Sequence, residues 1–117
     1  MKIKVNEATR IQLDWLVATI EGLDVYIPSF AETPWLAIRT DTGIYRCPSF
    51  TTDWAQGGAL LERELIATRP WIAEGDWSAT VRGGFYEQRG PTMLVAGLRC
   101  YVASKLGDEV EIPEELA

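Results

Sequence analysis

The sequence predicts an α+β fold in which a small antiparallel sheet is packed by two amphipathic helices. Two long stretches, 7–21 and 91–106, carry apolar residues at the spacing of a helix face. Between them lie short β-prone segments separated by glycine and proline. At 117 residues, 47% hydrophobic and 24% charged, the chain has the size and composition of one globular domain. Two helices on one sheet is the economical way to bury both apolar faces.

The first helix is expected to follow a short strand. Residues 2–5 alternate lysine with apolar side chains, as a half-buried strand does. Asn6 is a favourable N-cap for a helix over 7–21, and Gly22 stands where a glycine commonly ends a helix. The apolar residues of this helix share one broad face: Ile11, Trp15, Leu16, Ala18 and Ile20.

Three short strands are expected next. Residues 25–27 are β-prone and are stopped by Pro28, and 34–39 form a second such segment. The sequence Asp-Thr-Gly at 41–43 is typical of a turn, so 44–46 are predicted to return beside the second segment.

A second, shorter helix is expected near the middle of the chain. Asp53 and the threonines before it are suitable caps for a helix around 54–64. Gly57 and Gly58 fall inside that range, and two glycines cost roughly 2 kcal/mol in a helix interior. We therefore expect a loop through Gly58 and a helix only over 59–64.

The last third of the chain predicts a hairpin and then a helix. Residues 66–73 and 77–82 flank Glu-Gly-Asp, and Pro70 places the first of these strands at a sheet edge. The glycines at 83, 84 and 90 indicate a mobile loop.

Pro91 and Thr92 are well placed at the start of the final helix, in which apolar residues recur every four positions. Gly107 is expected to end this helix. The predicted domain covers 1–112, followed by a frayed acidic tail over 113–117.

Charge and composition exclude several classes of protein. Five of the 17 acidic residues fall in 107–117, so the rest of the chain, with 11 basic and 12 acidic residues, is almost neutral. This nearly neutral part of the chain lacks the basic stripe of a duplex-DNA binder. A small phosphorylated ligand, however, needs only a local cluster of hydrogen-bond donors. No apolar run is long enough to cross a membrane, and no signal peptide opens the chain.

The residues needed for common catalytic mechanisms are missing. The chain has no histidine, no glycine-rich phosphate loop and only two cysteines, so the sequence predicts a protein without a metal site, a cofactor or enzymatic activity. Cys47 and Cys100 are interpreted as small buried hydrophobic residues with free thiols. The alternative is a hydrolase that uses carboxylates alone, with Asp53 and Glu62 as candidates.

One segment combines the groups that a ligand with a base, a ribose and a phosphate would require. In this hypothesis Trp54 stacks on the base, the amides of Gly57 and Gly58 hold phosphate at a helix start, and Arg63 neutralises charge. Directional hydrogen bonds come from Thr52, Asp53 and Gln56. The possible walls of the site are Trp35, Tyr45 and Arg46. The alternative is that Gly57-Gly58 is only a tight turn and Trp54 a core residue.

Three stretches of the chain resemble a known family. They are 1–5 with 13–18, then 52–58 with 62–64, and 90–92 with 99–111. Together they resemble the NinX-type family of small proteins from lambdoid phages and enterobacterial prophages, a family of unknown function. The resemblance implies a phage accessory protein made in the cytoplasm of the host bacterium, and it implies no reaction.

The functional hypothesis is a non-enzymatic binder that sequesters a small nucleotide-derived immune signal of the host. The alternative is a protein-binding adaptor or inhibitor of a host factor, which would use exposed aromatic side chains and the acidic tail. A homodimer is also compatible with the sequence, since edge strands and spare aromatic side chains are easily shared between subunits. Neither duplex nucleic acid nor a membrane is expected as a partner.

Overall fold

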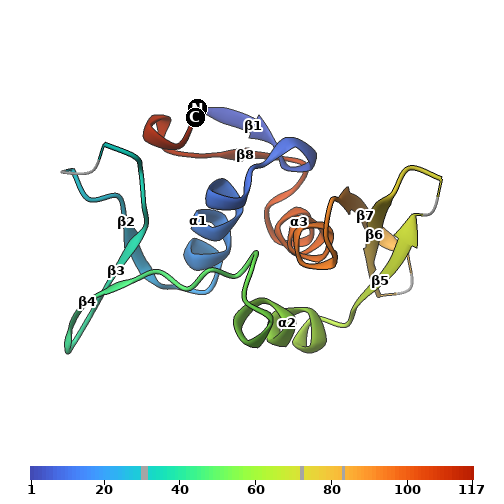
Figure 1. Cartoon of the computed structure of the whole chain (residues 1–117), viewed down its shortest axis with the longest axis horizontal. Coiled ribbons are helices and arrows are strands. Elements are labelled where there is room, and N and C mark those ends of the chain that lie inside the picture. Colours follow the sequence, from blue (N-terminus) through green and yellow to red (C-terminus); the bar gives the residue numbers. More distant parts are fainter. Residues whose placement is uncertain (30–31, 72, 83) are drawn as a thin grey trace.

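A computed structural model describes residues 1–29, 32–71, 73–82 and 84–117 and confirms the α+β fold (Figure 1). Among these residues it contains three α-helices, eight strands and two short 3₁₀ turns. In chain order the elements are β1 (Lys2–Lys4), η1 (Val5–Glu7), α1 (Arg10–Ile20), β2 (Asp24–Tyr26), β3 (Ala37–Thr40), β4 (Gly43–Arg46), α2 (Trp54–Arg63), β5 (Ile66–Trp71), β6 (Asp76–Val81), β7 (Phe85–Gly90), α3 (Met93–Leu106), β8 (Glu109–Glu111) and η2 (Glu114–Leu116).

The strands form three small antiparallel sheets where the sequence predicted one. The sheets have the orders β1-β8, β2-β3-β4 and β5-β6-β7. In Figure 1 the helices lie in the middle, with β2-β3-β4 on one side and β5-β6-β7 on the other, while both chain ends lie beside β1 and β8. Each sheet is too small to bury a helix by itself, so the helices supply most of the core.

Helix α3 is the centre of that core. It contacts α1, α2 and all three strands of the β5-β6-β7 sheet. Leu98 and Val102 are fully buried, and Tyr101 is almost so. The Oγ1 atom of Thr92 accepts from the Val95 amide at 3.1 Å, and Gly107 ends the helix with φ +92°. The C-terminal end was predicted from the sequence, but the helix begins at Met93, so Pro91 precedes the Thr92 cap and does not lie in the first turn.

Helix α1 begins three residues later than predicted. Val5–Glu7 form a 3₁₀ turn, and Thr9, not Asn6, is the N-cap. The Thr9 amide donates to Oε1 of Gln12 at 2.9 Å, while the Gln12 amide donates to Oγ1 of Thr9 at 3.5 Å. This reciprocal capping box satisfies two amides, which a lone Asn6 cap would not do. Gly22, with φ +80°, ends the helix as expected.

The prediction of a loop through Gly57-Gly58 is wrong, because α2 runs through both glycines. Neither residue has a positive φ. A methyl group at Gly57 would lie 2.0 Å from the Phe50 carbonyl oxygen, so glycine is required there by close packing. The low helix propensity of glycine is outweighed by this tertiary contact. Asp53 caps the helix as predicted, accepting from the Ala55 amide at 2.9 Å.

The hairpin of β5 and β6 is confirmed, but the loop expected after it contains a third strand. Gly75 has φ +73° in the turn, and Pro70 lies on the edge strand β5. Strand β7 then pairs with β6, with Trp77 opposite Gly90. Ile72 and Gly83, parts of the predicted strand and loop, lie outside the described residues.

The end of the chain is anchored, which differs from the frayed tail that the sequence predicted. Strand β8 pairs with β1, with Val110 opposite Ile3. Beyond it, Leu116 is 5% exposed and its carbonyl oxygen accepts from Nε2 of the buried Gln12 at 2.7 Å. In the described ranges, no helix is long and apolar enough to cross a bilayer.

Candidate functional site

A cavity of about 300 Å³ lies where the start of α1 faces the β3-β4 hairpin. We call it the Trp35 cavity. Helix α1 contributes Arg10, Ile11 and Asp14. The other lining residues are Pro34, Trp35, Leu36, Arg46, Cys47, Pro48, Ser49, Thr51 and Thr52. Three of the predicted ligand residues, Trp35, Arg46 and Thr52, are therefore brought together.

Two guanidinium groups face this cavity without a carboxylate partner. The Arg46 guanidinium lies 4.8 Å from the centre of the half-buried Trp35 ring, which is a cation–π contact. Arg10 lies on the opposite wall, on the first turn of α1. Neither arginine forms an ion pair with any residue that the structure describes. The charge of Arg46 is therefore available to an anionic ligand, and Arg10 adds a second positive charge that also acts on Asp14 in the same lining.

Asp14 is the only acidic side chain that lines the cavity among the described residues. Its carboxylate accepts from the Thr51 amide at 3.0 Å and from Oγ1 of Thr51 at 3.3 Å, so it ties α1 to the segment that leads into α2. Burial raises the pKa of Asp14 to about 6, and the Thr51 hydrogen bonds and Arg10 only partly oppose this effect. Near neutral pH the carboxylate is ionised but easily protonated.

The cysteines occupy the buried positions that the sequence predicted. Cys47 lines the cavity but is only 6% exposed, and burial raises the pKa of its thiol to about 11. Cys100 is fully buried in α3, and burial likewise raises its pKa to about 11. Both side chains are therefore protonated thiols near neutral pH and serve as small core residues.

The remaining predicted ligand residues lie elsewhere. Trp54 is on the exposed face of α2, and its ring covers Gly58. Gln56 is also exposed on this helix. The Tyr45 hydroxyl is 2.9 Å from Oγ1 of Thr42 within the β3-β4 hairpin. These side chains do not converge on a common cavity in the part of the chain that is described.

The Gly57 amide does not form the predicted phosphate cradle. It donates to the carbonyl oxygen of Asp53 at 2.8 Å, as an ordinary helix amide does. Gly57 is buried against Phe50 and Leu94. Gly57 thus serves helix packing, and the amides of Ala55, Gln56 and Gly57 are all bonded to Asp53.

Arg63 joins three helices and is not available to a ligand. Its NH1 and NH2 atoms donate to the two carboxylate oxygens of Glu21, each at 2.8 Å, and its Nε donates to Glu64 at 3.0 Å. NH2 is also 3.2 Å from the Tyr101 hydroxyl. These bonds raise the pKa of Arg63 and lower the pKa of Glu21. No sequence pattern indicates this network, because Glu21, Arg63 and Tyr101 are 38 or more residues apart in the chain.

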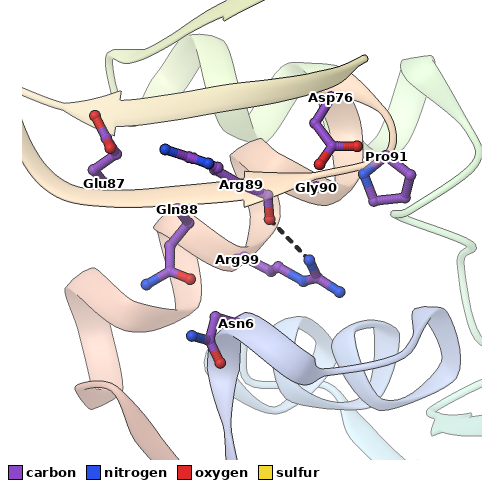
Figure 2. A pocket seen from close by; sticks show the side chains of 8 residues that line it. All are labelled: Asn6, Asp76, Glu87, Gln88, Arg89, Gly90, Pro91 and Arg99. Atoms are coloured by element: carbon purple, nitrogen blue, oxygen red, sulfur yellow. Dashed lines mark hydrogen bonds between the residues drawn. The ribbon is translucent and has the colours of Figure 1, made fainter. Parts of the chain in front are cut away.

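A second cavity, of about 440 Å³, was not predicted (Figure 2). Its deepest cation is Arg99, which donates to the carbonyl oxygens of Arg89 and Ala8, each at 2.8 Å. The Nε atom of Arg99 and Oε1 of Gln88 have no partner, but both are sealed from the cavity by neighbouring atoms. Asp76 and Glu87 add negative charge to the lining. Arg99 thus connects η1 to β7. Its guanidinium is already engaged, whereas the arginines of the Trp35 cavity form no ion pair with the described residues, so the Trp35 cavity is the better candidate for an anionic ligand.

The geometry defines a small α+β protein with a charged, aromatic cavity between a helix and a hairpin. The model of the family described as Bacteriophage P22, NinX matches residues 4–105. The chain belongs to this family, and the matched range contains every residue of the Trp35 cavity. No curated protein matches the chain. Membership confirms the resemblance and the phage origin, and it leaves the ligand and the reaction open.

Proposed function

We propose that this phage accessory protein is a non-enzymatic binder that sequesters a small nucleotide-derived signal of the host in the Trp35 cavity. The observation that carries the proposal is that Arg10 and Arg46, both outside any ion pair of the described residues, face the same cavity as the Trp35 ring. Two cations and an aromatic face match a phosphate joined to a base.

The chemistry of the walls supports a ligand that is both anionic and flat. A guanidinium stacked on an indole presents its outer face and its edge donors to solvent, so it can stack on a base while it donates to phosphate. Pro34 and Pro48 add apolar surface, and Thr52 adds a hydroxyl. The volume of about 300 Å³ lies at the lower end of ligand cavities, which range over roughly 300–1,000 Å³. The ligand is therefore expected to be small or only partly enclosed.

The lining also supports binding without reaction. The Cys47 thiol is held protonated, and Asp14 is engaged by two hydrogen bonds from Thr51. The carboxylates considered for a hydrolase have other roles: Asp53 caps α2, and Glu62 lies on the exposed face of that helix. Neither lines the Trp35 cavity.

Calorimetry with a panel of nucleotides, cyclic mononucleotides and cyclic dinucleotides tests this proposal. We expect one class to bind, and we expect Arg46→Ala to weaken that binding about tenfold or more, because the variant removes both the charge and the stacked plane. Arg39→Ala is the matched control, since Arg39 makes a similar contact with Tyr26 at 4.6 Å on the same sheet but does not line the cavity.

The bound nucleotide should be recovered unchanged by chromatography after long incubation. Conversion of any nucleotide by the pure protein would contradict the non-enzymatic role. Equal loss of affinity in Arg39→Ala and Arg46→Ala would contradict the assignment to this cavity, and absence of binding across the whole panel would contradict the ligand class.

A further inference from the structure

An exposed apolar surface lies at the start of β7 and the C-terminal ends of α2 and α3. We call it the Phe85 surface. In Figure 1 the β5-β6-β7 sheet lies on the opposite side of the helices from the β2-β3-β4 sheet. Phe85 is 66% exposed and Tyr86 is 52% exposed, although both belong to side-chain types that usually contribute to a core. Leu65, two residues after the end of α2, is 73% exposed, and Leu106, the last residue of α3, is 48% exposed.

Phe85 and Tyr86 line a common hollow. A cavity of about 410 Å³ is lined by Phe85, Tyr86 and residues from both helix ends. Among the latter, Nζ of Lys105 lies 2.8 Å from Oε1 of Glu64. This ion pair joins the ends of α2 and α3 beside the hollow, and the exposed Leu65 and Leu106 are the next residues along the chain.

The backbone is strained at the same place. In the described part of the chain, three residues other than glycine have positive φ: Leu65 at 58°, Arg82 at 49° and Tyr86 at 55°. The left-handed region costs an ordinary side chain roughly 1–2 kcal/mol. All three residues belong to the Phe85 surface or its lining. The fold thus keeps unfavourable backbone conformations where it presents apolar side chains to solvent, a combination that is enriched at binding surfaces.

The charge of the surface selects among possible occupants. Arg82 forms no ion pair with the residues described, and Lys105 shares Glu64 with Arg63. The hollow is therefore locally cationic, although the chain as a whole has a net charge of -6. Charge complementarity therefore favours a partner that brings carboxylates to Arg82 and Lys105.

We propose that the Phe85 surface docks a protein partner that presents an apolar side chain flanked by Asp or Glu. The apolar side chain would enter the hollow between Phe85 and Tyr86, and the flanking carboxylates would meet Arg82 and Lys105. This pattern, an aromatic centre with a charged rim, is how small interfaces obtain both affinity and specificity.

Selection from a random peptide library against the immobilised full-length chain tests the chemistry of this partner. We expect enriched peptides to carry Leu, Ile or Phe between acidic residues. Phe85→Ser should weaken a selected peptide about tenfold or more. Arg82→Glu should disfavour acidic peptides and favour peptides with basic flanks.

Trp54→Ala is the matched control, because Trp54 is also a large exposed aromatic residue but lies on α2 away from the hollow. It should leave the affinity of the selected peptides unchanged, and circular dichroism should show all variants folded. Failure to enrich any consensus, enrichment of basic peptides by the unmodified chain, or equal losses in Trp54→Ala would overturn the proposal. A dimer in sedimentation that Phe85→Ser dissociates would instead assign the surface to a second copy and would also overturn it.

Discussion

At the scale of single residues, the adjacent glycines of α2 have different neighbours and therefore different roles. Gly57 faces the backbone of Phe50, which cannot move without disturbing the chain before the helix. Gly58 faces only the ring of Trp54, an exposed side chain that can rotate away. One glycine is thus required by packing, while the other lowers helix stability without an evident packing reason.

Alanine at these two positions should have opposite effects. Gly57→Ala should lower the free energy of unfolding by about 2 kcal/mol or more, because its methyl group overlaps the Phe50 carbonyl oxygen. Gly58→Ala should raise it by up to about 1 kcal/mol through better helix propensity. Denaturant unfolding measures both. Equal effects of the two substitutions would show that the helix does not pack as described.

Asp14 predicts an unusual dependence of stability on pH. Its pKa of about 6 in the folded state exceeds the ordinary 3.8, so the folded protein binds this proton more tightly than the unfolded chain. The free energy of unfolding should therefore fall as pH rises from about 4 to about 7, by on the order of 1–2 kcal/mol after allowance for partial exposure. Glu21 and Glu64 have lowered pKa values, so they stabilise the folded state above about pH 4.5 and lose this contribution as the pH falls further. Their effect on the free energy of unfolding is therefore opposite in sign to that of Asp14.

Asp14→Asn separates these contributions. The amide keeps an oxygen that can accept from Thr51 and does not ionise, so the slope between about pH 4.5 and 7 should disappear. Urea unfolding over this range is the measurement. An unchanged slope in the variant would assign the effect to another group.

At the scale of elements, one polar network joins the ends of all three helices. Glu21 follows α1, Arg63 ends α2 and Tyr101 lies in α3. Arg63 bonds to both Glu21 oxygens, and the Tyr101 hydroxyl donates to one of them. The network fixes the relative positions of the helices, which apolar contacts alone specify less sharply.

Glu21→Gln should therefore lower the free energy of unfolding by about 1–2 kcal/mol, since it removes the negative charge shared by Arg63 and Tyr101. Glu62→Gln is the control: Glu62 is exposed on α2, and its side chain forms no hydrogen bond or ion pair within the described chain. Thermal unfolding at neutral pH compares them. Similar small changes in both variants would indicate that the network is only a surface ion pair.

At the scale of the whole molecule, the two ends of the chain close the core together. Strand β8 pairs with β1, and Leu116 packs into the cluster that contains residues of α1 and α3. The acidic side chains around it remain exposed. The segment therefore combines an apolar anchor with solvated charges, so its composition alone indicates a tail.

Removal of residues 113–117 should lower the free energy of unfolding by about 2 kcal/mol, because Leu116 loses its burial and Gln12 loses its acceptor. Replacing Glu114 and Glu115 by glutamine should leave stability nearly unchanged, since both are exposed. Denaturant unfolding of the two variants is the test. If the truncated chain were as stable as the full one, the prediction of a frayed tail would be correct.

The sequence was reliable where local chemistry decides the structure. Gly107 ends α3, Asp53 caps α2, and the turn at 41–43 joins β3 to β4 as predicted. It failed where a distant contact prevails: the helix through Gly57 depends on Phe50, and β7 depends on its pairing with β6. Of the predicted ligand residues, Trp35, Arg46 and Thr52 share a cavity, whereas Arg63 is held by Glu21.

By itself, the sequence determined the fold class, the family, the buried thiols and the C-terminal ends of the helices, because periodicity, caps and composition act over a few residues. Only the tertiary structure decided that the strands form three sheets, that the chain end is anchored, and which charged groups remain available to a ligand. The physical reason is that a side chain's availability depends on its partners, and the partners of Arg10, Arg46 and Arg63 are set by the packing of helices and strands that are far apart in the chain.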